Sequence, residues 1–292
     1  MIDAAALTRA RIEDPGSIAR AWRARRPGDW PEDGRHLFVA ADHPARGALS
    51  VRGRPVLASR TDLLDRLVAA LARPGVDGVL ATPDILEDLL LLGALEGKLV
   101  IGSMNRGGLQ GASFELDDRF TAFDAATITA HGLDGGKMLT RIDLADPGSA
   151  ATLEASGRAV TALAAAGKLA MVEPFLTTRR APDRVENLLD PDSVITSIAI
   201  ASGLGATSAH TWLKIPVVTE MERVLNATTL PTLLLGGDPT GHPDDTYAAW
   251  AAALALPPAA GLVVGRALLH PHDDDVAAAV DIAVSLVHGG RS

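Results

Sequence analysis

The sequence predicts a closed (β/α)8 barrel, also called a TIM barrel, formed by a single domain of eight parallel strands that alternate with helices. Eight β-rich runs alternate with helical patterns from residue 37 onward, and several are continuously apolar, as is typical of parallel strands covered by helices. No glycine-rich dinucleotide fingerprint follows the first run, which disfavours an open doubly wound sheet. The predicted strands are residues 37–41, 78–82, 99–103, 137–142, 169–175, 211–217, 232–235 and 261–264.

The segments between these strands carry signals for helix starts and ends. Thr82 and Pro83 form an N-cap and a first-turn proline, which predicts a helix over 84–96. We also predict helices over 117–131 and over 149–166, the second ending at a glycine. Residues 1–35 are expected to add an N-terminal helical segment, interrupted near Pro15, that caps the bottom of the barrel, and residues 36–292 are expected to form the barrel itself.

Composition excludes several classes of protein. The chain has 292 residues, of which 47% are hydrophobic and 22% charged, so it can bury one large core and is not disordered. It has no cysteine, which excludes disulfides, thiolate catalysis and cysteine-bound metals. A net charge of −9 argues against nucleic acid or an anionic membrane as a partner. Since neither a signal peptide nor a membrane-spanning stretch is evident, we expect a cytoplasmic protein.

Lysine is rare in this chain, and one lysine lies in an unusual place. Only four of the 27 basic residues are lysines, and Lys214 lies within the apolar run TWLKIPVV. Alternation along a strand puts Trp212, Lys214 and Pro216 on one face, which we expect to face the barrel interior. Burial lowers the pKa of an amine and frees it to attack a carbonyl. An ion-paired structural lysine remains the alternative interpretation.

Other charged residues stand near the strand ends, where barrel enzymes carry their active sites. Glu173 follows an apolar run, and a buried carboxyl with a raised pKa would suit proton transfer. Asp42 ends the first strand and is expected to move a proton or bind a substrate hydroxyl. Lys137 lies early on its strand, where a permanent cation would lower the pKa of a neighbouring amine. The alternative role of Glu173 and Asp42 is a structural ion pair, and the alternative for Lys137 is a surface lysine at the start of a strand.

Two glycine-rich strand ends predict a phosphate site. Gly236 and Gly237 end the seventh predicted strand, and Gly265 and Arg266 end the eighth. Barrels frequently bind phosphate at these two loops through backbone N–H groups, which glycine allows to approach the anion closely. Two ordinary turns are the alternative interpretation.

Arg141 shares a strand face with Lys137 and lies nearer the mouth of the barrel. Its planar guanidinium could bind a carboxylate at the end of a substrate remote from the phosphate. An ion pair with Asp143 or Glu173 is the alternative interpretation.

No metal site is expected from the histidines. His270 and His272 flank a proline and precede three aspartates, a pattern that could resemble a metal cluster. Since acidic residues are favoured at helix starts, we interpret this segment as a helix cap.

The assembled strand ends resemble the class I aldolase superfamily, which includes the deoxyribose-phosphate, tagatose-bisphosphate and archaeal fructose-bisphosphate aldolases. The chain more closely resembles actinobacterial barrel proteins associated with inositol catabolism, over about residues 36–270. The tagatose-bisphosphate type has a lysine at the start of strand 4, a glutamate at the end of strand 5 and the imine lysine on strand 6. Lys137, Glu173 and Lys214 match these positions in order, Asp42 matches the strand 1 aspartate, and Gly265-Arg266 matches the strand 8 pair.

This resemblance implies reversible aldol cleavage through an imine on Lys214, with no metal or organic cofactor. The implied substrate is 5-dehydro-2-deoxy-phosphogluconate, which would be cleaved to dihydroxyacetone phosphate and malonate semialdehyde. The chain departs from the family at Thr140-Arg141, where tyrosines are usual, and this substrate carries a carboxylate at the end opposite its phosphate.

Several alternatives remain open. Within the class they are a deoxyribose-phosphate aldolase and a ketose-bisphosphate aldolase. Outside it they are a metal-dependent enzyme that uses His43 or His270, and a non-catalytic sugar-phosphate binding protein. In each case the expected partner is a phosphorylated small molecule, and we expect a homo-oligomer.

Overall fold

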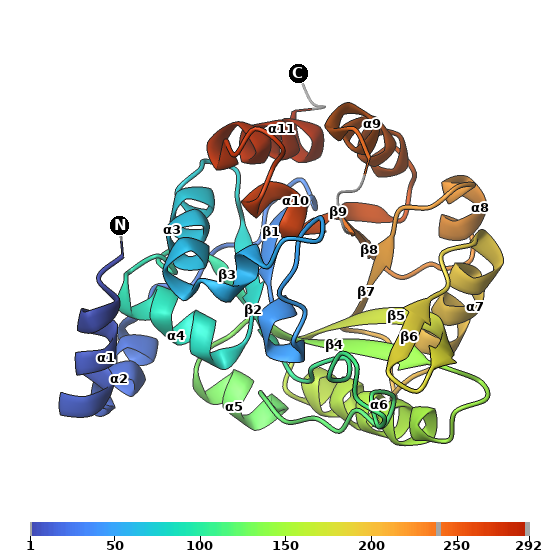
Figure 1. Cartoon of the computed structure of the whole chain (residues 1–292), viewed down its shortest axis with the longest axis horizontal. Helices are drawn as coiled ribbons and strands as arrows, with labels where there is room; N and C mark the ends of the chain where they lie inside the picture. Colours follow the sequence, from blue (N-terminus) through green and yellow to red (C-terminus); the bar gives the residue numbers. More distant parts are fainter. Residues whose placement is uncertain (1, 238–240, 290–292) are drawn as a thin grey trace.

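The computed structural model describes residues 2–237 and 241–289 as parallel strands ringed by helices (Figure 1). The strands of the ring are β1 (His36–Ala41), β2 (Gly78–Ala81), β3 (Leu99–Ser103), β4 (Gly135–Ile142), β5 (Leu169–Ala181), β7 (Thr211–Pro216), β8 (Thr232–Leu235) and β9 (Ala259–Val264).

These eight strands close into the predicted barrel. They follow the order β4-β3-β2-β1-β9-β8-β7-β5, and β4 also pairs with β5, so the ring has no open edge. All of the pairings within the ring are parallel. The (β/α)8 fold expected from the alternation of elements is therefore confirmed.

Alternation along the strands separates two cores. The inward side chains form a layer inside the barrel that includes Phe38, Leu80, Ile101, Met171 and Val263. The outward side chains pack with the helices in a second, larger cluster. Because the interior is filled by this apolar layer, a charged side chain on the same face is taken out of water.

Helices follow the barrel strands and cover the outside. They are α3 (Arg60–Leu71), α4 (Pro83–Leu91), α5 (Ala125–Ala130), α6 (Gly148–Ala165), α7 (Pro191–Ser202), α8 (Met221–Leu225), α9 (Pro243–Leu254), α10 (Arg266–Leu269) and α11 (Val276–His288). The 3-10 helices η1 (His43–Arg46) and η2 (Val56–Ala58) lie between β1 and α3. None of the helices in the described ranges is long and apolar enough to cross a membrane.

The acidic segment before α11 acts as a helix cap, as predicted. The side chain of Asp275 accepts a hydrogen bond from the backbone N–H of Ala278. Within residues 2–237 and 241–289, no group of three or more histidine, aspartate or glutamate side chains could hold a metal ion.

The N-terminal segment is helical and interrupted at Pro15, as predicted, with α1 (Ala4–Glu13) before the break and α2 (Gly16–Ala24) after it. Helix α2 packs against α4, on the outside of the barrel (Figure 1). The chain that follows α2 reaches the bottom of the barrel, where Trp30 packs on His36 and Trp212, at the starts of β1 and β7. The bottom is therefore closed by the residues after α2 and not by the two helices themselves.

The first departure from prediction is a β-hairpin. Strand β5 was expected to end at residue 175, but it continues to Ala181 and pairs antiparallel with β6 (Arg184–Asn187). The extension reaches beyond the barrel, where β4 pairs with it up to Leu176. This hairpin places Val185 and Asn187 beside the end of β4.

The second departure is the predicted helix over residues 117–131, of which only α5 is helical. The loop between β3 and α5 is instead held by buried polar groups. Asp118 accepts hydrogen bonds from Gly107 N at 2.7 Å and from Asn105 Nδ2 at 2.8 Å, and its own N–H donates to Thr152. These tertiary hydrogen bonds outweigh the local helix propensity of the segment.

Candidate active site

Four charged side chains meet inside the barrel. Lys137 Nζ of β4 lies 2.7 Å from Asp42 Oδ2 and 2.5 Å from Glu173 Oε2. Lys214 Nζ of β7 lies 3.1 Å from the same Glu173 oxygen. The two lysine side chains are 2% and 4% exposed, and both carboxylate side chains are 10% exposed. The four candidate catalytic residues predicted from the sequence are thus brought into one buried cluster.

The order of the strands explains this meeting. Strand β5 lies between β4 and β7, so Glu173 stands between the two lysines. Asp42 follows β1 directly and reaches Lys137 across the top of the barrel interior. Lys214 faces the interior, as the alternation of its strand predicted.

The two lysines have pKa values shifted in opposite directions. Burial lowers the pKa of Lys214, and the Lys137 cation lowers it further, although the Glu173 carboxylate partly offsets both effects. Burial also acts to lower the pKa of Lys137, but the carboxylates of Asp42 and Glu173 together raise it above the ordinary lysine value. Lys137 is therefore the lasting cation of the cluster, and Lys214 is the amine that loses its proton more easily.

The two acids are held in their ionised forms. Burial acts to raise the pKa of Asp42, but the Lys137 and Lys214 cations outweigh it and hold this pKa well below its usual range. The same two cations lower the pKa of Glu173. The raised pKa predicted for Glu173 from the sequence is wrong, because two lysines contact one of its oxygens. The resting Glu173 is a carboxylate and thus a proton acceptor.

His43 lies beside this cluster and is neutral. Its Nδ1 atom is 3.7 Å from Asp42 Oδ1. Burial lowers the pKa of His43 to about 3; the Asp42 carboxylate opposes this shift, and the Arg266 and Lys214 cations add to it. The charge of Arg266, at the end of β9, is therefore close enough to act on His43, next to the buried cluster.

Close packing explains why glycine is required at two of the positions that end β8 and β9. A Cβ atom at Gly265 would clash with the carbonyl oxygen of Ala40, and one at Gly236 would lie 2.6 Å from Cγ1 of Val264. Gly237 has a φ of 62°, in the left-handed region that favours glycine. The predicted phosphate site stays a prediction, with Arg266 as its cation.

Arg141 is held by protein groups at the top of β4. Its Nη1 pairs with Glu115 of the β3–α5 loop, its Nε donates to Asn187 Oδ1 at 3.1 Å, and its Nη2 donates to the carbonyl of Val185 at 3.1 Å. Both Arg141 and Glu115 are buried. The expected contact between Arg141 and a substrate carboxylate does not fit this network, because every guanidinium nitrogen already has a protein acceptor. The partner is Glu115, and not Asp143 or Glu173.

Glu115 is a buried residue of the barrel mouth that the sequence did not predict. Glu115 lies between the predicted strand over residues 99–103 and the predicted helix over residues 117–131, and nothing in its local sequence sets it apart from a solvated glutamate. Its partners Arg141 and Arg46 lie 26 and 69 positions away in the chain, and only folding brings the three together.

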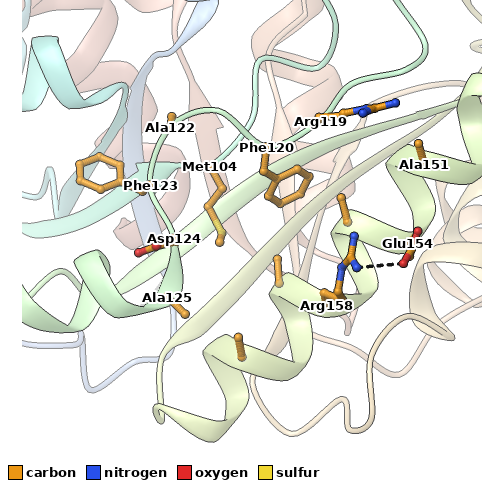
Figure 2. A pocket seen from close by; sticks show the side chains of 13 residues that line it. Met104, Arg119, Phe120, Ala122, Phe123, Asp124, Ala125, Ala151, Glu154 and Arg158 are labelled. Atoms are coloured by element: carbon orange, nitrogen blue, oxygen red, sulfur yellow. Dashed lines mark ion pairs between the residues drawn. The ribbon is translucent and has the colours of Figure 1, made fainter.

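A groove of about 750 Å³ lies outside the barrel and is separate from this cluster (Figure 2). Phe120 and Phe123 of the β3–α5 loop line one side of it. Ala155 of α6 and the ion pair of Arg158 with Glu154 line the other side. None of the four interior charged residues lines this groove, so the candidate active site is the barrel interior.

Comparisons with known proteins relate the whole chain to one family. The model of the Cgl0159-like family matches residues 34–284. The crystal structure of Cgl0159 from Corynebacterium glutamicum (Brevibacterium flavum) is 53% identical, with 97% of this chain and 96% of that chain covered and a TM-score of 0.94. No curated protein matches the chain.

More distant structures share the fold. An archaeal fructose 1,6-bisphosphate aldolase is 18% identical, with 94% of this chain and 100% of that chain covered and a TM-score of 0.65. A Schiff base-forming fructose-1,6-bisphosphate aldolase, studied through its reaction intermediates, is 18% identical over 93% of this chain and 100% of that chain, with a TM-score of 0.63. At such identities the likeness establishes a common barrel fold.

Proposed function

This chain belongs to the Cgl0159-like family, and from the chemistry of its barrel interior we propose that it is a class I aldolase with Lys214 as the imine-forming lysine. One observation carries the proposal. A buried lysine with a lowered pKa shares a carboxylate oxygen with a second buried lysine. Bringing such a cluster into an apolar interior costs solvation energy, and perturbed groups of this kind are typical of catalytic sites.

The cluster supplies each group that the chemistry needs. The neutral amine of Lys214 adds to the substrate ketone, and loss of water gives an iminium ion. The Glu173 carboxylate, directly or through water, takes the proton from the hydroxyl beyond the scissile bond. That oxygen becomes a carbonyl as the carbon–carbon bond breaks, and the bonding electrons move onto the iminium to give an enamine. The enamine then takes up a proton, and water releases the ketone product and the free lysine.

The remaining charged groups support these steps. The Lys137 cation lowers the pKa of Lys214 and so raises the fraction of neutral amine at a given pH. The Asp42 carboxylate, held by Lys137, is available to orient a substrate hydroxyl. No step calls for a metal or an organic cofactor.

The solved structure of a Schiff base-forming fructose-1,6-bisphosphate aldolase supports the same chemistry in a related barrel. Lys137, Glu173 and Lys214 also follow the order of charged residues along the strands of tagatose-bisphosphate-type aldolases. A shared fold supports the reaction class but does not determine the substrate.

The proposed substrate is 5-dehydro-2-deoxy-phosphogluconate, the compound implied by the resemblance of the sequence to barrel proteins associated with inositol catabolism. Its phosphate would bind the backbone N–H groups of Gly236, Gly237 and Gly265 together with the guanidinium of Arg266. Cleavage would release malonate semialdehyde first and dihydroxyacetone phosphate second. Deoxyribose 5-phosphate and ketose bisphosphates are the competing substrates.

Borohydride trapping tests the proposal directly. Dihydroxyacetone phosphate and borohydride should add a covalent mass to the peptide that contains Lys214, and Lys214→Arg should remain folded and take no label. Attachment to Lys137, or an active Lys214→Arg variant, would contradict the assignment. Loss of activity with a chelator would favour a metal-dependent enzyme. Tight binding of the sugar phosphate without turnover would favour a binding protein.

A further inference from the structure

Arg46 is a second arginine at the mouth of the barrel, and its hydrogen bonding is incomplete. Its side chain is 17% exposed, and its Nη2 lies 3.5 Å from Glu115 Oε1. Its Nε atom is buried and has no hydrogen-bond partner among the described residues. A buried donor without an acceptor is costly, so it marks a place where an acceptor is expected to bind.

The carboxylates near Arg46 are already engaged by other donors. Glu115 Oε1 pairs with Arg141, and Glu115 Oε2 accepts from Gly111 N at 3.2 Å. Asp118 accepts from Gly107 N and from Asn105 Nδ2. The buried guanidinium of Arg141 and the partly buried guanidinium of Arg46 therefore share one glutamate oxygen, and Arg46 is the one whose Nε has no acceptor among the described residues.

The position of Arg46 suits one end of an extended substrate. It is the last residue of η1, the short 3-10 helix that begins directly after Asp42. Its partner network includes Arg141, which lies four residues beyond Lys137 on β4, or about 13 Å along the strand. The network is therefore above the lysines, toward the mouth of the barrel.

The strand order places the Arg141 end of this network opposite the predicted phosphate site, and the Arg46 side chain reaches that end from the turn that follows β1. Going around the ring from β9, which ends before Arg266, the strands are β1, β2, β3 and then β4. In a ring of eight strands, β9 and β4 are diametrically opposed. The buried lysines lie below both ends, so a substrate with an anionic group at each end could span the mouth above them.

We propose that Arg46, held in place by Glu115 and Arg141, binds the carboxylate at the end of the substrate remote from the phosphate. A guanidinium presents parallel N–H groups that match the two oxygens of a carboxylate. Arg141 and Glu115 are positioning residues: their ion pair holds the Glu115 carboxylate in place, and that carboxylate in turn holds the Arg46 side chain. This inference rests on the proposed aldolase function and adds to it the residue that selects an acid.

The test uses the condensation direction, in which the two ends of the substrate arrive separately. Dihydroxyacetone phosphate is the donor, and malonate semialdehyde competes with propanal, which lacks the carboxylate. The ratio of the two kcat/KM values is measured within each variant. A lower fraction of active protein reduces both values equally and therefore leaves the ratio unchanged. Arg46→Met should lower the preference for malonate semialdehyde about 10- to 100-fold, the range for one charge-assisted contact. Arg46→Lys, which keeps the charge, should retain part of the preference.

Arg106→Met is the matched control. Arg106 is exposed and, like Arg46, links the β3–α5 loop to the η1 turn. It donates hydrogen bonds to the carbonyl of Ala45 and to the hydroxyl of Thr121, and it forms no hydrogen bond or ion pair with Glu115. Its acceptor preference should equal that of the unmodified protein. An unchanged preference in Arg46→Met, or an equal fall in Arg106→Met, overturns the role of Arg46. If dihydroxyacetone phosphate and borohydride do not label Lys214 in the unmodified protein, the aldolase proposal fails, and this inference fails with it.

Discussion

Lys137 and Lys214 lie on opposite sides of β5 and contact the same oxygen of Glu173, at 2.5 Å and 3.1 Å. Because both side chains contact one carboxylate oxygen, the amino groups of Lys137 and Lys214 are held close together. A positive charge on one of them therefore disfavours a positive charge on the other. The charge of Lys137 is stabilised further by Asp42, so Lys214 is the group whose pKa falls. This asymmetry between two lysines of the same cluster underlies the first two predictions.

Replacing Lys137 should move imine formation to higher pH. The Lys137 cation lowers the pKa of Lys214, so Lys137→Met should raise that pKa. Because only the neutral amine attacks a carbonyl, the rate of borohydride trapping rises with pH, and its midpoint should shift upward in the variant. Lys137→Arg keeps the charge and serves as the control. Equal midpoints in Lys137→Met and the unmodified protein would argue against the assigned role of Lys137.

Glu173→Gln should separate imine formation from turnover. The glutamine retains a side-chain oxygen near Lys137 but cannot accept the substrate proton. Imine should still be trapped on Lys214, whereas kcat should fall by roughly 10²- to 10⁴-fold, the usual contribution of a general acid or base. Single-turnover trapping and steady-state rates measure the two steps. A normal kcat would reduce Glu173 to a structural residue.

Arg266→Ala should weaken the binding of phosphorylated substrates specifically. Loss of a charge-assisted hydrogen bond to phosphate should cost about 1.5–3 kcal/mol, measured as an increase in KM. The comparison is with a dephosphorylated analogue, whose KM should not change. If both substrates lose affinity equally, Arg266 supports the structure of the β9 end and does not bind the phosphate.

Arg141→Met should destabilise the protein, because it leaves Glu115 buried without its main partner. The side chains of Arg141 and Glu115 are 5% and 2% exposed, and breaking a buried ion pair typically costs about 3–5 kcal/mol. Arg119→Met removes the pair of Arg119 with Asp117 in the same loop, where Arg119 is 78% exposed, so its cost should be about 0–1 kcal/mol. Denaturant unfolding of both variants measures the difference. Equal unfolding free energies would mean that the buried pair does not hold the loop.

The sequence by itself determined the barrel and the direction in which Lys214 points. Both follow from short-range rules. Parallel strands covered by helices are continuously apolar, and side chains alternate between the two faces of a strand. The same rules indicated which strand ends would meet, because all strands of a parallel barrel end at the same rim. Glu173 and Asp42 were identified as candidates in this way. Lys137 was identified as one of only four lysines and from the family resemblance, and the three residues lie together.

Only the tertiary structure decided which charges act on one another and how the mouth is built. The lowered pKa of Glu173 depends on two lysines that lie 36 and 41 residues away in the chain. Arg141 is held by Glu115, which lies 26 residues away and for which the sequence predicted no role. Electrostatic and hydrogen-bond energies depend on distances through space and on burial, and neither is encoded in the local pattern of the chain. Helix propensity over residues 117–124 amounts to a few tenths of a kcal/mol per residue, so the buried hydrogen bonds of Asp118 could override it.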